Sequence, residues 1–130
     1  MNKMRLGYTI LYVEDVERTI EFYESAFGLK KLFIHESGEY GELDTGDTKL
    51  AFVSYELAES NNVGFTKLSK NNETSTMEIA LITDDVEAAF NHAVRTGAKE
   101  VQEPAQKPWG QTVAYVTDLN GFLIEICPPI

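Results

Sequence analysis

Two glutamates, Glu78 and Glu125, are the residues of this sequence best placed to do chemistry. Each interrupts an apolar, strand-like run, 77–82 in one case and 122–127 in the other. Because successive side chains of a strand point to opposite faces, each run has one fully apolar face and one face with a single carboxylate. If the two carboxylates lie together away from water, one pKa rises and that residue can donate or accept a proton. Glu78 and Glu125 are therefore the candidate catalytic residues; the alternative is that they are separated and solvated, or paired with Lys or Arg.

The single cysteine, Cys127, is interpreted as structural. It lies two residues from Glu125 and points to the same side of its strand. A reactive thiol needs a neighbouring base or cation, whereas a nearby carboxylate raises the thiol pKa. One cysteine also excludes an intramolecular disulfide and a cysteine-based zinc cluster, and it is compatible with a reducing cytoplasm.

An internal repeat positions these residues. Val13–Glu17 opens an amphipathic helix that ends at Gly28, and Thr83–Glu87 opens a second that ends at Gly97. Each helix follows one strand-like run and precedes three more, so the sequence predicts a βαβββ module written twice. One such module is too small to bury its sheet face alone, and two must combine. Two sheets side by side would form a concave surface, the expected cup, suited to a small molecule.

The predicted organisation is a single α+β domain over residues 1–130. Module one covers 4–55, a linker covers 56–74, and module two covers 75–130. The linker lacks periodicity; we expect a plain connection with a short ordered turn at Val63–Leu68, the alternative being a lid over the site. The expected strands are 8–13, 31–36, 40–43, 48–55, 77–82, 101–105, 112–116 and 122–127.

Charge and composition narrow the possible partners. The 130 residues include 21 acidic and 11 basic side chains, a net charge of −10. Such a chain repels phosphate backbones, so nucleic acid is not an expected partner, whereas a neutral or cationic ligand is compatible. No apolar run approaches the ~20 residues of a membrane span, and the first residues lack a signal-peptide core. The expected location is the cytoplasm, with no membrane contact.

Four segments, together with the repeat, resemble the vicinal oxygen chelate superfamily, which includes glyoxalase I, bleomycin-resistance proteins and extradiol dioxygenases. The segments are Val13–Tyr23, Phe27–Leu29, Pro108–Gln111 and Asp118–Ile126. The resemblance implies two βαβββ modules that form a curved half-open barrel with an outer helix on each. Because members commonly dimerise, it also implies a homodimer.

The resemblance also indicates where a metal would bind. Enzymes of this superfamily chelate one divalent metal through the first and last strands of each module, usually with His, Gln or Glu. Carried onto this sequence, those positions fall at Tyr8, Phe52, Glu78 and Glu125. Only the two glutamates are good ligands, and a stable open site needs about three protein donors. No metal cofactor is therefore expected; if a divalent metal does bind, Glu78 and Glu125 would hold it.

The two histidines do not restore the metal site. His92 lies within a predicted helix between apolar positions, and His35 lies on a predicted strand. Both are interpreted as structural. The alternative for His35 is a polar contact or proton carrier in the cup.

Aromatic side chains take the place of the missing ligands. Tyr8, Tyr12 and Phe52 are expected to face the cup, and Trp109 lies on a loop that could cover its rim. Aromatic walls with a few carboxylates suit a flat or cationic organic molecule. The alternatives are core packing for Tyr8 and Phe52 and a loop anchor for Trp109. The predicted ligand-binding residues are Tyr8, Tyr12, Phe52, Glu78, Trp109 and Glu125.

Two functions fit these observations. The first is a metal-free small-molecule binding protein of the bleomycin-resistance kind, with a degenerate metal site. The alternative is a divalent-metal-dependent lyase or isomerase of the glyoxalase I type, in which water or substrate completes the metal coordination. A dioxygenase is disfavoured because its iron site needs two His and one carboxylate. The sequence leaves open whether any catalysis occurs and does not identify the ligand.

Overall fold

The computed structural model describes residues 3–68 and 74–129. The chain forms two compact units. The first consists of Met1–Glu24 and Gly28–Thr66, and the second of Ser25–Phe27 and Lys67–Ile130. Each unit contains one four-stranded sheet of the same topology.

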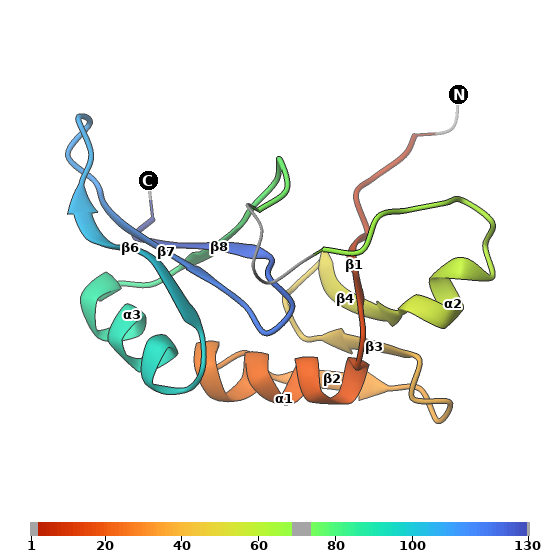
Figure 1. Cartoon of the computed structure of the whole chain (residues 1–130). Coiled ribbons are helices and arrows are strands. Elements are labelled where there is room, and N and C mark those ends of the chain that lie inside the picture. The colour runs from red at the N-terminus through yellow and green to blue at the C-terminus, as the bar shows by residue number, and fades with distance from the viewer. Residues whose placement is uncertain (1–2, 69–73, 130) are drawn as a thin grey trace. The chain divides into compact units, whose positions relative to one another are not determined.

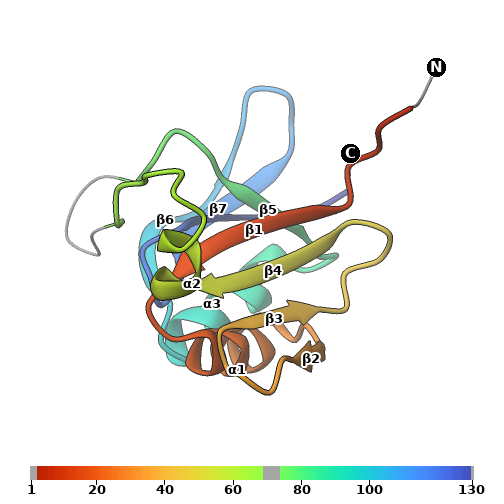
Figure 2. The same ribbon diagram turned by 90° about the vertical axis from the view of Figure 1, so that its right-hand side faces the viewer.

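The first sheet has the strand order β1-β4-β3-β2, and Figure 2 shows these four strands side by side. Strands β1 and β4 run parallel, and the other neighbours run antiparallel. The elements of this part of the chain are β1 (Tyr8–Val13), α1 (Val16–Phe27), β2 (Lys31–Ile34), β3 (Tyr40–Leu43), β4 (Lys49–Ser54) and α2 (Tyr55–Glu59).

Helix α1 begins and ends where its sequence dictates. The carboxylate of Asp15 accepts a hydrogen bond of 3.0 Å from the backbone N–H of Arg18, which satisfies a free N–H of the first turn. Gly28 ends the helix in the left-handed conformation, with φ 70°. The helix covers one face of the first sheet: a Cβ atom on Gly41 of β3 would lie only 2.5 Å from Cδ1 of Ile20. Glycine at this position therefore lets the helix approach the sheet backbone.

The second sheet repeats this plan with the order β5-β8-β7-β6, and β5 runs parallel to β8. Asp85 caps its helix by accepting a 3.0 Å hydrogen bond from the N–H of Ala88. Figure 1 shows this helix, α3, against one side of β6, β7 and β8. The elements are β5 (Ile79–Ile82), α3 (Val86–Arg95), β6 (Lys99–Gln106), β7 (Thr112–Thr117) and β8 (Leu123–Cys127).

An apolar layer lies between α3 and the second sheet. The helix buries Val86, Phe90 and Ala93, and β8 buries Ile124 and Ile126. The alternation predicted for 122–127 is therefore confirmed, with Glu125 on the opposite face from these isoleucines.

The prediction of an α+β fold with two βαβββ modules is confirmed. The linker differs from expectation: helix α2 (Tyr55–Glu59) begins at its start, because the Ser54 hydroxyl accepts from the N–H of Leu57. The ordered turn expected at Val63–Leu68 is wrong; these residues adopt no regular structure, although Phe65 packs its ring 4.8 Å from that of Tyr12. The remainder of the expected linker, 69–73, lies outside the described residues.

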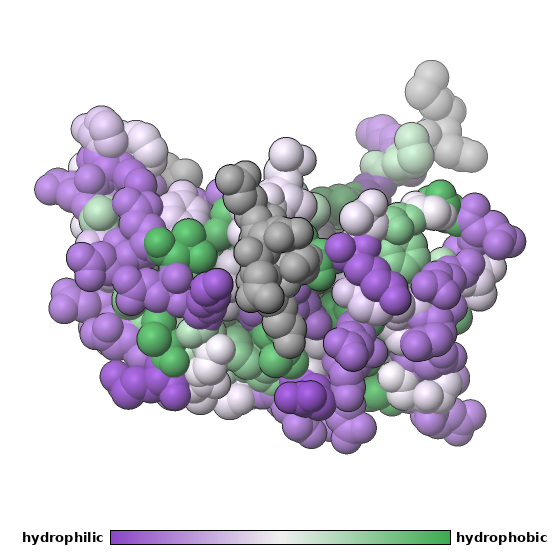
Figure 3. Space-filling model, viewed as in Figure 1, coloured by the Kyte–Doolittle hydropathy of each residue, from purple (hydrophilic) through white to green (hydrophobic). Residues whose placement is uncertain are grey.

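Hydrophilic residues cover most of the face shown in Figure 3, with hydrophobic residues in small groups between them. In the described part of the chain, every helix is too short or too polar to cross a membrane.

Candidate functional site

The structure brings Glu78 and Glu125 together. Glu125 lies on β8 opposite Ala80 of β5, and Glu78 comes two residues before Ala80, so both carboxylates lie on the face away from α3. Their side chains share a hydrogen bond. A third group joins them, because the hydroxyl of Tyr115 on β7 donates to Oε1 of Glu125 at 2.9 Å.

The shared hydrogen bond separates the pKa values of the two carboxyl groups. It is the main cause that raises the pKa of Glu78 to about 7, with desolvation and the negative charge of Glu125 adding to the effect. The same bond lowers the pKa of Glu125. Hydrogen bonds from Tyr115 and Cys127 and the positive charge of Lys107 also lower this pKa, because they stabilise the ionised carboxylate. Between pH 4.5, the usual pKa of a glutamate side chain, and about pH 7, the pair therefore holds one proton, mainly on Glu78.

The neighbours of Glu125 remain protonated at neutral pH. Burial, followed by the hydrogen bond to Glu125, raises the pKa of Tyr115 to about 12. Burial likewise raises the pKa of the Cys127 thiol, and Glu125 adds to the rise. This agrees with a structural Cys127, because a thiol that is not ionised is a weak nucleophile. Lys107 lies over Tyr115, with Nζ 5.7 Å from the ring centroid.

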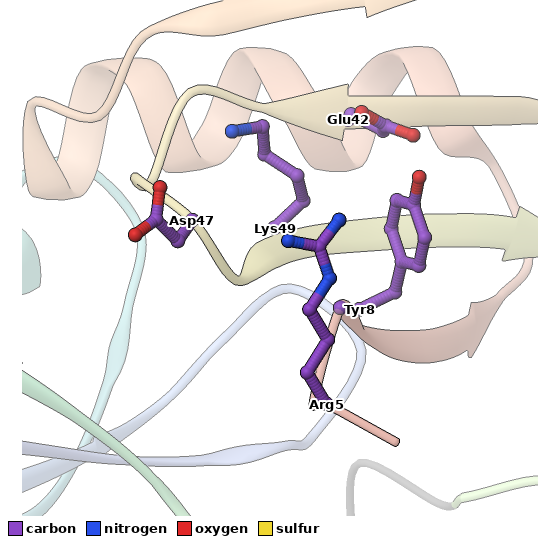
Figure 4. A pocket seen from close by; sticks show the side chains of 6 residues that line it. Arg5, Tyr8, Glu42, Asp47 and Lys49 are labelled. Carbon is purple, nitrogen blue, oxygen red and sulfur yellow. The ribbon is translucent and has the colours of Figure 1, made fainter. Parts of the chain in front are cut away.

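A pocket of about 450 Å³ opens on the first sheet (Figure 4). It lies on the face away from α1: Tyr8 on β1 pairs with Lys49 on β4, and Glu42 on β3 pairs with Ala51. Its lining consists of Arg5, Gly7, Tyr8, Glu42, Asp47 and Lys49. Of these, the sequence indicated only Tyr8. The one available signal for Glu42 was that it is a single charged residue between the uncharged residues Gly41 and Leu43. Glu125 is likewise a single charged residue within an apolar strand.

Burial and a hydrogen bond hold Glu42 in place in the lining of this pocket. Only 8% of it is exposed, and the hydroxyl of Tyr40 donates to Oε2 at 2.8 Å. Burial raises the pKa of Tyr40 well above its usual range, and the hydrogen bond to Glu42 raises it further. Tyr40 is therefore a permanent hydrogen-bond donor that orients the Glu42 carboxylate.

Phe52 does not face this pocket, so that prediction is wrong. Its side chain is fully buried, and its ring lies 4.9 Å from the ring of Tyr23 on α1. The strand register explains the error. Tyr8 and Ile10 of β1 point to the pocket face, and the β4 residue that pairs with Ile10 is Ala51. Phe52 pairs instead with Leu11, which points to the opposite face. In the first sheet, the position on β4 that corresponds to Glu125 is therefore that of Ala51.

Neither Tyr12 nor Trp109 is among the residues that line this pocket. Tyr12 packs against Phe65, whose ring also stacks on Tyr55 at 5.8 Å. Trp109 is 71% exposed on the loop between β6 and β7, and its Nε1 donates to Oε1 of Gln111 at 2.9 Å. Gln111 in turn donates to the carbonyl of Pro128, which fixes the loop.

Both histidines make hydrogen-bonding contacts with other parts of the structure. The ring Nδ1 of His35 accepts from the N–H of Ser37 at 3.0 Å within the turn that follows β2. Nε2 of His92 lies 2.7 Å from the carbonyl oxygen of Ser25.

The described residues do not fit the metal centre that the resemblance implies. Within 3–68 and 74–129, no three His, Cys, Asp or Glu side chains gather in an arrangement that could hold a metal ion. Glu78 and Glu125 share a proton that a cation would have to displace. The corresponding first-sheet positions, Tyr8 and Ala51, offer a neutral phenol and a methyl group.

Comparisons with known proteins agree with this fold. The family model of the Glyoxalase/Bleomycin resistance protein/Dioxygenase superfamily matches residues 5–126. Lactoylglutathione lyase of Escherichia coli O157:H7 is 34% identical over 131 residues, covering 95% of this chain and 91% of the relative. Uncharacterized protein YraH of Bacillus subtilis (strain 168) is 32% identical over 126 residues, covering 95% and 97%. The crystal structure of a glyoxalase-related enzyme from Fulvimarina pelagi matches 98% of this chain and 89% of its own, with a TM-score of 0.83 and 21% identity.

Proposed function

Because this chain belongs to the glyoxalase/bleomycin resistance protein/dioxygenase superfamily, we propose that it binds a small organic molecule through its own side chains, without a catalytic metal. The observation that carries this proposal is the pocket on the first sheet. It contains Tyr8, one of the four positions that the resemblance assigns to metal ligands, together with charged groups that can contact an organic ligand directly.

The chemistry of the pocket supports binding rather than metal chelation. Glu42 and Tyr8 supply hydrogen-bonding groups, and Arg5 and Lys49 supply positive charge. Pockets of about 300–1,000 Å³ with a few placed polar groups accommodate small organic ligands. We propose that Tyr8 forms one aromatic wall and that Glu42, oriented by Tyr40, fixes the position of the ligand.

A ligand screen on metal-depleted protein tests the proposal. The purified full chain, treated with chelator and dialysed, is screened by thermal shift and by NMR against neutral, cationic and anionic aromatic compounds. We expect saturable binding that shifts the signals of Tyr8 and its neighbours. Binding that appears only after Ni²⁺, Zn²⁺ or Mn²⁺ is restored would contradict the proposal.

A metal-dependent lyase is the second candidate, favoured by one observation in the second sheet. Several relatives are named lactoylglutathione lyase, and the pKa of Glu78 is raised to about 7, where a carboxyl group can exchange protons readily. Lactoylglutathione lyase activity, measured with and without added Ni²⁺, Zn²⁺, Mn²⁺ and Fe²⁺, tests this alternative. Metal-dependent turnover that is lost in Glu125→Gln would establish it.

We also propose that the protein is a cytoplasmic homodimer. The dimer is proposed because members of the superfamily commonly dimerise, and the location is proposed because a single cysteine is compatible with a reducing compartment. Light scattering coupled to gel filtration measures the mass directly. A mass of one 14.6 kDa chain at micromolar concentration would contradict the dimer.

A further inference from the structure

Two cationic side chains reach the first-sheet pocket from separate segments of the chain. Arg5 precedes β1, and Lys49 opens β4; Figure 4 shows both side chains lining the pocket beside Tyr8. Tyr8 and Lys49 are direct neighbours across the parallel pair β1–β4, so their side chains leave the sheet on one face. The pocket lining thus places two cations beside two carboxylates, Glu42 and Asp47, in a chain whose net charge is −10.

Within the described part of the chain, these two cations are not paired directly with the acidic residues beside them. The Lys49 ammonium donates to the carbonyl oxygen of Gly46 rather than to a carboxylate. Among the described residues, neither Arg5 nor Lys49 forms an ion pair, although Glu42 and Asp47 line the same pocket. A guanidinium beside an ammonium can bind the two oxygens of a carboxylate or the oxygens of a phosphoryl group through charge-assisted hydrogen bonds.

A hydrogen-bond acceptor stands at the other end of the pocket. The hydroxyl of Tyr40 donates a hydrogen bond to Oε2 of Glu42, and Oε1 has no partner among the described residues. Because no buried side-chain oxygen in the described part of the chain lacks a partner, Oε1 must be accessible. It can accept a hydrogen bond from a hydroxyl or ammonium group of a ligand.

The strand register sets the spacing between the two ends. Glu42 pairs with Ala51, which lies two residues beyond Lys49 on β4. Two residues of an extended strand span roughly 7 Å. That is about the length of one benzene ring with a substituent at each end, and the volume of about 450 Å³ accommodates such a molecule.

We infer that this pocket takes a small organic anion with a hydrogen-bond donor at its far end. Arg5 and Lys49 hold the carboxylate or phosphoryl group, Glu42 accepts from the hydroxyl or ammonium group, and the Tyr8 ring lies against the body of the ligand. This inference rests on the proposed function and narrows it from any small organic molecule to one chemical class.

The test is a calorimetric titration of the full chain with four probes. The first two, 4-hydroxybenzoate and 4-hydroxyphenyl phosphate, carry both groups and distinguish a carboxylate from a phosphoryl ligand. The third, 4-hydroxybenzamide, lacks the anion, and the fourth, benzoate, lacks the donor. At least one of the first two should bind about ten-fold or more tightly than the corresponding probe without the anion or donor, because each lost contact is charge-assisted.

Charge-neutral variants locate the binding site. Arg5→Gln and Lys49→Gln should each weaken binding of the anionic probe about ten-fold while leaving 4-hydroxybenzamide unchanged. Lys99→Gln, an exposed lysine on β6 in the second unit, is the matched control and should bind like the wild type.

Two results would overturn the inference. One is equal affinity for 4-hydroxybenzoate, 4-hydroxyphenyl phosphate and 4-hydroxybenzamide, including the case in which none of them binds. The other is an anionic probe that binds Arg5→Gln and Lys49→Gln as tightly as it binds the wild type. The proposed function is judged separately, because the broader screen contains neutral and cationic compounds, whose binding would not depend on these two cations.

Discussion

Ala51 holds in the first sheet the place that Glu125 holds in the second. Ala51 pairs with Ile10 on the parallel neighbour strand, and Glu125 pairs with Ala80 on the strand that corresponds to it. The two modules therefore share the backbone register, but the side chain at this position is a methyl group in the first sheet and a carboxylate in the second. This difference separates the chemistry of the two sheets.

In the first sheet the carboxylate lies on the neighbouring strand, β3, and not on β4. Glu42 faces Ala51 from β3, whereas Tyr115 faces Glu125 from β7. Each sheet thus retains one hydrogen bond between a tyrosine hydroxyl and a glutamate, but with different positions supplying the acid. Glu42 shares its pocket with Arg5 and Lys49, whereas Glu125 shares a hydrogen bond with Glu78.

Truncation of two aromatic residues tests the side-chain directions in the first sheet. Phe52→Ala should lower the free energy of unfolding by about 3–5 kcal/mol, because it removes a fully buried ring that packs on Tyr23. Tyr8→Ala should cost less than about 1 kcal/mol, because Tyr8 is 56% exposed. Urea unfolding followed by circular dichroism measures both values. Similar losses for the two variants would contradict the assigned directions.

A double-mutant cycle tests the close contact between α1 and β3. Gly41→Ala should destabilise the protein by about 1–3 kcal/mol, since the new methyl group would lie 2.5 Å from Cδ1 of Ile20. Ile20→Val removes that carbon, so the double variant should lose less stability than the sum of the single variants. Additive losses would show that Ile20 is not the residue that excludes a side chain at position 41.

The glutamate pair predicts a pH dependence of stability. The pKa of Glu78 is raised from 4.5 in a free side chain to about 7 in the folded chain, so the folded state binds the proton more tightly. Its stabilising contribution is fully present below pH 4.5 and is lost as the pH rises through 7. Relative to Glu78→Gln, the wild type should therefore lose thermal stability between pH 4.5 and 7. Glu14→Gln, on the loop before α1, is the control, and a constant difference between wild type and Glu78→Gln would contradict the shared proton.

The Tyr115 hydroxyl should tune the acidity of Glu125. Tyr115→Phe removes the 2.9 Å hydrogen bond that favours the ionised carboxylate, so the pKa of Glu125 should rise. Carbon-13 NMR titration of the carboxyl groups measures this change. Tyr40→Phe removes the equivalent bond to Glu42 in the first unit and should leave the titration of Glu125 unaltered. An unchanged Glu125 in Tyr115→Phe would mean that the other neighbours alone set its acidity.

The repeat, the helix starts and the face of Glu125 could all be predicted from the sequence, because each depends on local signals. Asp15 and Asp85 are N-cap residues and indicate where the two helices begin. The strict alternation of apolar residues around Glu125 assigns its side chain to one face of the sheet. The direction of Phe52 could not be predicted in this way. Residues 50–53 are all apolar, so alternation gives no preference between faces, and only pairing with β1 decides.

The residues that line the first-sheet pocket could not be predicted from local sequence signals either. Arg5, Glu42 and Lys49 lie far apart in the sequence and meet only because β4 lies between β1 and β3. No short motif links a residue before one strand with residues on two others. Helix α2 was missed because its five residues are too few to establish a periodicity.

The parallel pairing of each module's first and last strands has a consequence for how the chain folds. Tyr8 pairs with Lys49, which is 41 residues later (49 − 8), and Ile79 pairs with Ile124, which is 45 residues later (124 − 79). During synthesis, β1 and β5 therefore cannot pair until nearly the whole of their modules has been made. The slow step of folding should be closure of these two long loops, so the first strand of each module is the last to become protected from hydrogen exchange.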